Sequence, residues 1–597
     1  MHNNLRKNLI LADRGRRNLK LERVYRELYD ENRLLDCYGK LYRNDGAMTP
    51  GVTPETVDRM SLEKIQRIIT ALRDGSFAWT PTKRIYIPKT NGKMRPLGLP
   101  TWTDKIVQDA IRSIIEPYYE ARFRSTSHGF RPKRGCHTTF QEIKEQFKGA
   151  AWFIEGDIKG CFDNINHDVL LDILRESIDD ERFLRLIRDM LQAGYLEKWT
   201  YHLSLGGTPQ GGVISPLLAN VYMHKLDEYV EDVLIPEYTR GKARKRNPEY
   251  TAICRAMAKA KADEDEKRWW ELKQQQRTIR CGTATDPTYR RLHYVRYADD
   301  FILSFIGPKT ETEDIKTRIG VFLRETLRLE MSKEKTLVTH AATEKARFLG
   351  YDVSVQYPDD YIIPAKNGQG MFTGRMANGR IRLEVPMEKI MAYRKKFTEN
   401  GKAVHRKDQL ANDDYSIVIW FEQVFRGFAE YYGMAVDRAK KLLPLKWVVE
   451  TSMLKTLAAK HRLTVNQVAR KYRVWIETPE GRRRAFQVVV ERPGKKPLVA
   501  TFGGYTLKRN HNPKTIKETT TCWWWSARTE ILERMLANKC EYCDQEGPCE
   551  VHHIRKVGPL LRKKGLAGWK KMMAMRNRKT LVLCRECHDK LHAGTLD

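Results

Sequence analysis

The most informative stretch of the chain reads His293-Tyr294-Val295-Arg296-Tyr297-Ala298-Asp299-Asp300-Phe301-Ile302-Leu303-Ser304-Phe305, in which two β-prone runs flank an acidic pair. Neighbouring side chains on a strand point to opposite faces, so the two carboxylates converge only if a turn separates the runs. The pattern therefore predicts a β-hairpin with Asp299 and Asp300 at its tip. Carboxylates held this close repel each other unless a cation lies between them, and Mg²⁺ is the usual cation. A turn with two solvated Asp side chains is the alternative, because Asp is common in turns.

A second acidic strand lies upstream, between Trp152 and Asp163. Nucleotidyl transfer uses two metal ions that align the attacking 3′-oxygen and stabilise the leaving pyrophosphate. Two ions need about three acidic ligands from separate segments, and Asp157 supplies the third beside the Asp pair. The alternative for Asp157 is a charge on an edge strand. For Asp163 we favour the N-cap of a helix.

The charge of the chain indicates its partner. The 597 residues carry a formal net charge of +33, with a hydrophobic content of 41% that supports folded cores. Such an excess of positive charge favours a polyanion. Because no apolar run approaches a membrane span and the N-terminus has no signal-peptide core, the sequence favours nucleic acid over a membrane, and an intracellular protein.

Shifts in composition predict an α+β multidomain protein with four parts. The first, residues 1–385, mixes short β-prone runs with helical patterns, and the second, residues 386–475, is almost wholly helical. The third, residues 476–530, has short β-prone runs and basic clusters, and the fourth, residues 531–597, is a small Cys/His module. A charged, helix-prone stretch at about 240–290 is either a solvated insertion or an arm that faces RNA.

Cysteines crowd the last part of the chain. An odd total of 11, with CxxC pairs, argues for metal binding and against disulfides. Four thiolates at this spacing form a closed, tetrahedral, structural zinc site. Cys549 is then left over as a free thiol. The four predicted ligands are Cys540, Cys543, Cys584 and Cys587.

Six blocks resemble, in order, the motifs of reverse transcriptases encoded by group II introns. Any one block is a weak signal, whereas six in the right order are specific. Asn44–Val52 also resembles the N-terminal extension of group II intron and non-LTR enzymes. The blocks are Lys89–Pro100, Ser127–Pro132, Asp157–Asp163, Gly207–Asn220, Tyr297–Asp300 and Phe348–Tyr351.

The resemblance implies roles for single residues. It implies that Asp157, Asp299 and Asp300 bind magnesium, and that the ring of Phe162 excludes a 2′-hydroxyl; a core aromatic is the alternative for Phe162. It also implies contacts with the incoming deoxynucleoside triphosphate. The residues with that role are Lys89, Arg95 and Gln210, with Lys335 as a proton donor to pyrophosphate. A solvated surface charge is the alternative for Lys89 and Arg95.

The first three parts of the chain resemble a right-hand polymerase followed by a DNA-binding segment. Residues 1–385 correspond to fingers and palm, and residues 386–475 to the α-helical thumb, called domain X in maturases. Residues 476–530 correspond to a small DNA-binding segment. Basic residues of the thumb are candidates to follow a phosphate backbone, and Trp523-Trp524-Trp525 either packs internally or stacks on bases. The basic residues are Lys455, Lys460, Arg462, Lys471 and Arg473.

The Cys/His module resembles an HNH endonuclease, a zinc-stabilised ββα-metal fold. The resemblance implies that His553 is the general base and that Asn577 orients it. It also implies that one divalent ion is held by the other three histidines. A structural zinc ribbon whose histidines contact DNA is the alternative. The three metal-binding candidates are His552, His588 and His592.

Together these features predict a reverse transcriptase–maturase with an HNH endonuclease. Its expected partners are group II intron RNA, target DNA and deoxynucleoside triphosphates, with Mg²⁺ at the polymerase and nuclease sites and structural Zn²⁺, and a homodimer is left open. The expected location is cytoplasmic, in a nucleoid-associated ribonucleoprotein, with an organelle not excluded. A splicing-only maturase and a reverse transcriptase of another bacterial retroelement are the alternatives.

Overall fold

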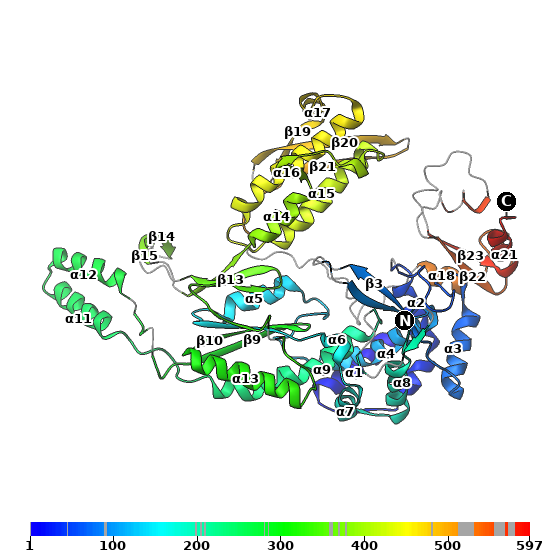
Figure 1. The fold of residues 1–597 in the computed structure, drawn as a ribbon, viewed down its shortest axis with the longest axis horizontal. Coiled ribbons are helices and arrows are strands. Elements are labelled where there is room, and N and C mark those ends of the chain that lie inside the picture. Colours follow the sequence, from blue (N-terminus) through cyan, green and yellow to red (C-terminus); the bar gives the residue numbers. More distant parts are fainter. Residues whose placement is uncertain are drawn as a thin grey trace.

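The computed structural model describes most of the chain and shows a central body with three attached parts (Figure 1). A helical lobe stands above the body, a helical hairpin extends to the left, and the C-terminal module lies at the right. Every helix among the described residues is too short or too polar to span a lipid bilayer. The described ranges are 2–44, 46–88, 92, 94–197, 200–202, 206–207, 211–279, 281–283, 286–332, 334–356, 362–367, 370–375, 379–478, 481–492, 494–510, 530–554, 568–570, 573 and 579–596.

A four-stranded antiparallel sheet forms the centre of the body, in the order β11-β5-β10-β9. Both faces are covered, because successive residues of β5 and β10 are apolar and enter different hydrophobic clusters. Phe153 and Ile302 pack with residues of α5, whereas Ile154 and Phe301 share a cluster with residues of α9 and α13. The bounds are β5 Trp152–Asp157, β9 Arg291–Tyr297, β10 Asp300–Ile306, β11 Leu337–His340, α5 Cys136–Gln146, α9 Ser215–Tyr229 and α13 Lys309–Glu325.

A second four-stranded sheet, in the order β4-β3-β7-β8, lies beside a group of N-terminal helices. The long helix α4 is buried along most of its length and contacts both α1 and α2. The bounds are α1 His2–Arg16, α2 Glu31–Leu41, α3 Leu62–Asp74, β3 Thr82–Pro88, β4 Met94–Leu99, α4 Trp102–Glu120, α6 Cys161–Asn164, α7 His167–Ser177, α8 Glu181–Gln192, β7 Tyr195–Glu197 and β8 Thr200–His202. Two short parallel strands, β1 Leu21–Glu22 and β6 Ile178–Asp179, join this region to the segment before α8.

The helical lobe contains a sheet as well as helices. Helices α15 and α16 confirm the helical pattern that the sequence shows in residues 386–475. Strand β19 crosses residues 475 and 476, where the sequence places a domain boundary, and Phe486 and Phe502 of its sheet share a core with Phe425 of α15. The bounds are α14 Met387–Lys395, α15 Asp414–Tyr431, α16 Arg438–His461, α17 Val465–Tyr472, β19 Arg473–Thr478, β20 Gly481–Arg492 and β21 Lys495–Gly503. A small sheet, β12 Ala346–Phe348, β13 Tyr351–Gln356 and β16 Arg380–Glu384, connects the lobe to the body.

The C-terminal module is built on a β-hairpin that gains a third strand from the N-terminal region. The strand order is β2-β22-β23, with Met60 opposite Val551 and Ser61 opposite Glu550. Apolar residues of the module belong to the same hydrophobic cluster as residues of α2 and α4, so the module is packed on the body. The bounds are β2 Met60–Ser61, α18 Glu530–Leu536, β22 Cys549–His553, β23 Thr580–Cys584 and α21 Arg585–Ala593.

The charged stretch at 240–290 forms a helical hairpin of α11 (Pro248–Ala262) and α12 (Glu266–Thr278). It projects from the body at the left of Figure 1. Its own small cluster contains Met257, Ala260 and Leu272. The helices that the sequence predicts there are therefore confirmed.

Two candidate metal-binding active sites

The acidic hairpin has the geometry that the sequence predicts. Strands β9 and β10 pair in antiparallel register with Asp300 opposite Tyr297, and Ala298 takes a positive φ of 57° in the turn. On its other side, Asp300 lies opposite Asp157 of β5. The pairing of the three strands brings the carboxylates of Asp157, Asp299 and Asp300 to one edge of the sheet.

A buried ion pair holds this hairpin from below. The Arg296 guanidinium has no exposed surface and donates to both carboxylate oxygens of Asp227, over 2.7 and 2.6 Å. It also donates to the carbonyl oxygen of Ala298 over 2.7 Å, which fixes the turn between the two strands. Tyr294 adds a hydrogen bond to Asp227 over 2.9 Å. Asp227 was not singled out from the sequence, because a lone Asp in a helical pattern gives no signal.

Two of the sequence blocks form the walls around this pair. The Ser127 hydroxyl accepts a hydrogen bond from Arg296 over 2.8 Å, and the Asn220 side chain accepts another over 3.1 Å. Asn220 also donates to the Gly129 carbonyl over 2.8 Å. A Cβ on Gly129 would lie 2.3 Å from the backbone nitrogen of Ala298, so only glycine allows this close approach. These blocks therefore position the hairpin.

A pocket of about 640 Å³ opens over the carboxylates. Its lining combines acidic, basic and aromatic side chains from distant segments, and several of them were predicted from the sequence as site residues. Lys89 and Gln210 lie outside the described residues. The predicted site residues that line the pocket are Arg95, Asp157, Phe162, Asp299, Asp300 and Lys335.

The electrostatics of the pocket favour a cation. Burial, and then the nearby charges of Asp299 and Asp157, raise the pKa of Asp300 to about 7. Burial also raises the pKa of Asp299, and the charge of Asp157 adds to that effect. Lys335 places its Nζ 3.0 Å from each oxygen of Asp157. Because crowded carboxylates resist ionisation together, a divalent ion would remove this penalty, and the donor set fits one.

Phe162 and Asp163 follow the first acidic strand on a short helix. The Phe162 ring is half-buried, lines the pocket and meets the ring of Phe130 edge to face at 6.1 Å. The N-cap that we expected at Asp163 is instead Gly160, whose φ of 56° lies in the left-handed region, and Asp163 falls inside α6. The expectation was wrong because the helix begins two residues before Asp163.

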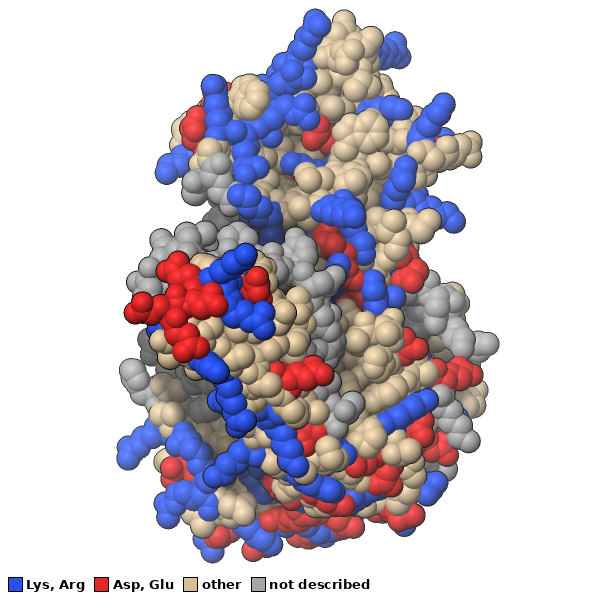
Figure 2. Space-filling model, turned by 90° about the vertical axis from the view of Figure 1, so that its left-hand side faces the viewer, with Lys and Arg blue, Asp and Glu red and all other residues tan. Residues whose placement is uncertain are grey.

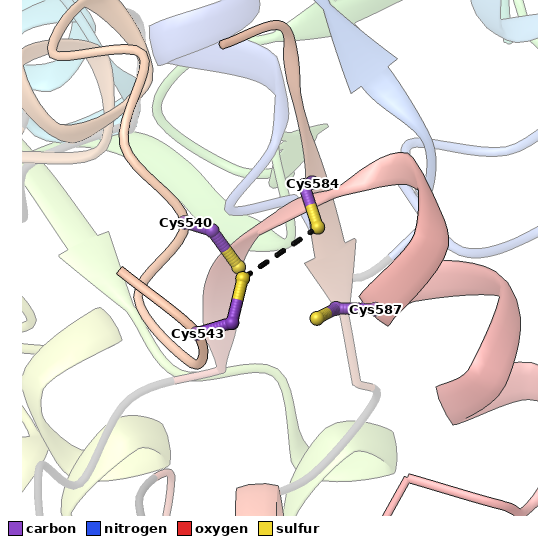
Figure 3. Close-up of side chains that lie close together, drawn as sticks. All are labelled: Cys540, Cys543, Cys584 and Cys587. Carbon is purple, nitrogen blue, oxygen red and sulfur yellow. Dashed lines mark hydrogen bonds between the residues drawn. The ribbon is translucent and has the colours of Figure 1, made fainter. Parts of the chain in front are cut away.

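A four-cysteine cluster lies in the C-terminal module (Figure 3). Cys540 and Cys543 come from the loop after α18, Cys584 from the end of β23 and Cys587 from α21. One Sγ from each lies within 4.8 Å of the others, a convergence that fits a tetrahedral metal ion with thiolate ligands. Cys549 stays outside the cluster, and burial raises the pKa of its thiol to about 11.

The second cluster joins three histidines at the junction of the module and the body. His552 Nδ1 lies 3.3 Å from His588 Nε2, which lies 3.1 Å from His592 Nε2. Two nitrogens bound to one zinc-like ion at 2.0–2.1 Å and at the tetrahedral angle are separated by about 3.3 Å. The observed spacing therefore fits a shared ion. All three histidines had been predicted from the sequence as metal-binding candidates.

Two carboxylates complete the histidine cluster, and sequence reasoning missed both. Glu550 Oε2 lies 2.7 Å from His588 Nδ1, the position of a carboxylate that orients a metal-binding imidazole. Alternation along β22 places Glu550 on the same face as His552, a signal that was available. Asp58 joins the cluster from the N-terminal region, and no sequence signal links it to histidines that lie 494 to 534 residues away.

His553 lies on the opposite face of β22. Its Nε2 is 3.0 Å from the Tyr38 hydroxyl, and burial lowers the pKa of the imidazole to about 3. The ring lines a pocket of about 680 Å³ beside Arg43, Arg534 and Lys579. The imidazole is therefore neutral at neutral pH and lies near cationic side chains. Asn577 lies outside the described residues.

The basic residues of the helical lobe divide into two groups. Lys460 pairs with Asp414 over 2.7 Å, and Lys455 donates to the Ala403 carbonyl over 2.7 Å, so both stabilise the lobe itself. Arg473 is exposed on β19. On the face shown in Figure 2, Lys and Arg side chains predominate over acidic ones on the upper lobe. The aromatic segment 523–525 lies outside the described residues.

The two sites have the donor sets of two classes of nucleic-acid enzyme. Carboxylates beside an arginine are typical of nucleotidyl-transferring polymerases, and a ββα metal module is typical of nucleases. Comparison with known families agrees with these classes, and three families match consecutive parts of the chain. Residues 87–353 match the reverse transcriptase (RNA-dependent DNA polymerase) family, residues 378–493 the type II intron maturase family, and residues 540–588 the AI2M/AI1M-like HNH endonuclease family.

Whole-length relatives agree with these matches. The chain is 36% identical to the group II intron-encoded protein LtrA of Lactococcus lactis subsp. cremoris, over 95% of both chains. It is 34% identical to an uncharacterized 91 kDa protein in a cob intron of Schizosaccharomyces pombe, over 97% of this chain and 71% of the relative. It is 31% identical to a putative COX1/OXI3 intron 1 protein of Saccharomyces cerevisiae, over 94% of this chain and 67% of the relative. The chain belongs to the group II intron-encoded proteins and is a multifunctional enzyme with reverse transcriptase, maturase and HNH endonuclease domains.

Proposed function

We propose that Asp157, Asp299 and Asp300 hold the magnesium ions of the reverse transcriptase. The observation that carries this proposal is their convergence in one pocket with Arg95 and Phe162. Bound magnesium would supply the charge that stabilises the leaving pyrophosphate. Arg95 suits bidentate contact with a triphosphate, and Phe162 limits space beside the sugar. Lys335 lies beside Asp157 in the same pocket, where its ammonium group can donate a proton to pyrophosphate.

The domains take the arrangement of a right hand. The central sheet is the palm, the sheet of β3 and β4 belongs to the fingers, and the helical lobe is the thumb that contacts intron RNA. Exposed aromatic side chains of the lobe, Trp447 and Trp475, support this role because unpaired bases stack on such rings. A separate DNA-binding segment after residue 475 stays a prediction.

The C-terminal module binds two kinds of metal ion with different tasks. The four cysteines hold a structural zinc ion that joins the loop after α18 to β23 and α21. The three histidines hold the divalent ion of the nuclease, and imidazole ligands suit zinc or another transition-metal ion. Magnesium at the nuclease stays a prediction, because it prefers oxygen ligands. His553 then activates the attacking water, with the basic wall of its pocket next to the DNA backbone.

The two activities act in sequence on one DNA strand. The nuclease breaks a phosphodiester bond of the target DNA, and the 3′-hydroxyl that it leaves is the primer that the polymerase extends along the intron RNA. The substrates are target DNA and deoxynucleoside triphosphates, and the template is the intron RNA that the chain also helps to splice. A homodimer and a nucleoid-associated cytoplasmic location stay predictions.

Separate variants of the two sites test this proposal. Asp299→Ala should abolish Mg²⁺-dependent extension of a primed RNA template and leave binding of the intron RNA and nicking of DNA intact. His592→Ala should remove nicking and leave extension intact. Extension by the Asp299→Ala protein would refute the carboxylate assignment, and normal nicking by the His592→Ala protein would refute the histidine assignment.

A further inference from the structure

The nuclease metal cluster contains a ligand from another domain. Asp58 Oδ2 lies 2.9 Å from His592 Nε2 and 3.6 Å from His588 Nε2. Its other oxygen lies 3.3 Å from His552 Nδ1 and accepts a hydrogen bond from the backbone N–H of His553 over 2.7 Å. One carboxylate therefore faces all three histidines of the cluster.

The contacts around Asp58 hold it in this position. Strand β2, which begins two residues later, pairs with β22, and the Arg59 N–H donates to the Val551 carbonyl over 3.1 Å. The Arg59 side chain bridges to Asp589 of α21 over 2.8 Å and approaches Glu550 at 3.8 Å. Backbone pairing and these ion pairs join the N-terminal region to both sides of the cluster. Asp58 is only 13% exposed, so its position follows from the docking of the module.

The number of protein ligands decides what such a site can do. A catalytic zinc-type site has three protein ligands and an open position, whereas four protein ligands make a closed site. Three histidines alone leave room for a phosphate oxygen, and Asp58 fills that room. The same docked surface places the Tyr38 hydroxyl against His553, while Tyr42 packs on the His553 ring with the two ring centres 5.9 Å apart.

We infer that Asp58 is the fourth ligand of the nuclease metal ion, and that it keeps the site closed while the module is docked on the N-terminal region. Binding of target DNA must withdraw Asp58 before a scissile phosphate can reach the ion. The nuclease is thereby prevented from cutting DNA that does not displace this contact. The inference rests on the proposed three-histidine site.

Metal binding at the histidine cluster tests whether Asp58 is a ligand. The full-length chain is used with zinc at the four-cysteine site. Co²⁺ is titrated in and followed by the visible absorption that imidazole ligands produce. Asp58→Asn should weaken Co²⁺ binding by about tenfold or more, whereas Asp58→Glu should keep most of it. Glu55→Gln is the matched control, because Glu55 lies on the same segment but pairs with Lys64. Unchanged Co²⁺ affinity in Asp58→Asn would overturn the inference.

The rate of DNA nicking tests whether Asp58 keeps the metal site closed. At saturating metal, Asp58→Asn should nick non-target supercoiled DNA severalfold faster than the unmodified chain, and Glu55→Gln should not. Equal or slower nicking would overturn the inference, because Asp58 would then leave the site open or assist the reaction. Retained primer extension and retained zinc show that each variant is folded. If His592→Ala keeps its Co²⁺ affinity, the three-histidine site itself is wrong; if it loses affinity and Asp58→Asn does not, only the role of Asp58 is wrong.

Discussion

Replacing Asp227 by Asn tests the buried support of the polymerase hairpin. In the native chain Asp227 and Arg296 are both fully buried, with hydrogen bonds over 2.6 and 2.7 Å. The substitution keeps the shape of the side chain but leaves the guanidinium without a counter-charge. Removing one member of a buried pair costs about 3–5 kcal/mol. Since Arg296 also holds the Ala298 carbonyl, the loss reaches the hairpin that carries Asp299.

Calorimetry of the full-length chain measures this cost. The unfolding entropy is about 2.1 cal/mol/K per residue, or about 0.8 kcal/mol/K for residues 1–385, so a loss of about 3–5 kcal/mol should lower the melting temperature of the reverse transcriptase transition by about 4–6 °C. The pKa of Asp227 also determines how the stability of the hairpin changes with pH. Burial alone would raise the pKa of Asp227, but the charge of Arg296 lowers it to about 2. The stabilisation is therefore present at neutral pH and is lost as the pH falls below the ordinary range of a carboxyl group.

Two further variants complete this experiment. Asp227→Leu combined with Arg296→Met removes both charges but also removes the donor to the Ala298 carbonyl, so it should recover part of the lost melting temperature. Glu271→Gln on α12 breaks an exposed pair with Arg268 and should leave the transition unchanged. A shift below about 2 °C for Asp227→Asn would refute the reasoning.

Three other predictions concern the two sites. Phe162→Ala should increase incorporation of ribonucleotides relative to deoxynucleotides, because the ring lines the pocket and limits space beside the sugar. An unchanged sugar preference in single-nucleotide extension would refute this role of the ring. Glu550→Gln should weaken Co²⁺ binding at the histidine cluster by about 10–100-fold while the four-cysteine site keeps its zinc, because the carboxylate orients His588; equal affinity would show that this contact has no role. The apparent Mg²⁺ affinity in primer extension should be about tenfold weaker at pH 6 than at pH 8, because an Asp300 carboxyl with a pKa of about 7 must lose its proton to bind the ion; a pH-independent affinity would contradict this.

Local pattern was sufficient to predict that the three carboxylates would lie close together. The two β-prone runs on either side of Asp299 and Asp300 were enough to predict the hairpin, and its register with β5 brings Asp157 beside it. The four cysteines were found because their spacing is itself a signal. In both cases a short motif, the Asp pair between two strands or a CxxC pair, is recognisable by itself.

Contacts between distant segments could not be predicted in this way. Asp58 reaches the histidines only because β2 pairs with β22 across the interface of two domains. Asp227 is an ordinary helical residue until α9 packs under β9 and places it against Arg296. The sequence predicted that most of the sheet of β19, β20 and β21 belongs to a separate part after the helical one, but its aromatic residues are buried against α15. These features depend on tertiary packing, which composition and periodicity do not contain.

Labelled target DNA tests most directly whether the two sites act on one strand. The ribonucleoprotein is incubated with DNA labelled at the 5′ end of the strand that is nicked, together with Mg²⁺ and deoxynucleoside triphosphates. The account predicts a labelled strand that is longer than the nicked fragment and ends in intron-complementary sequence. A labelled fragment that stays at the nicked length while intron cDNA grows from a separate primer would contradict it.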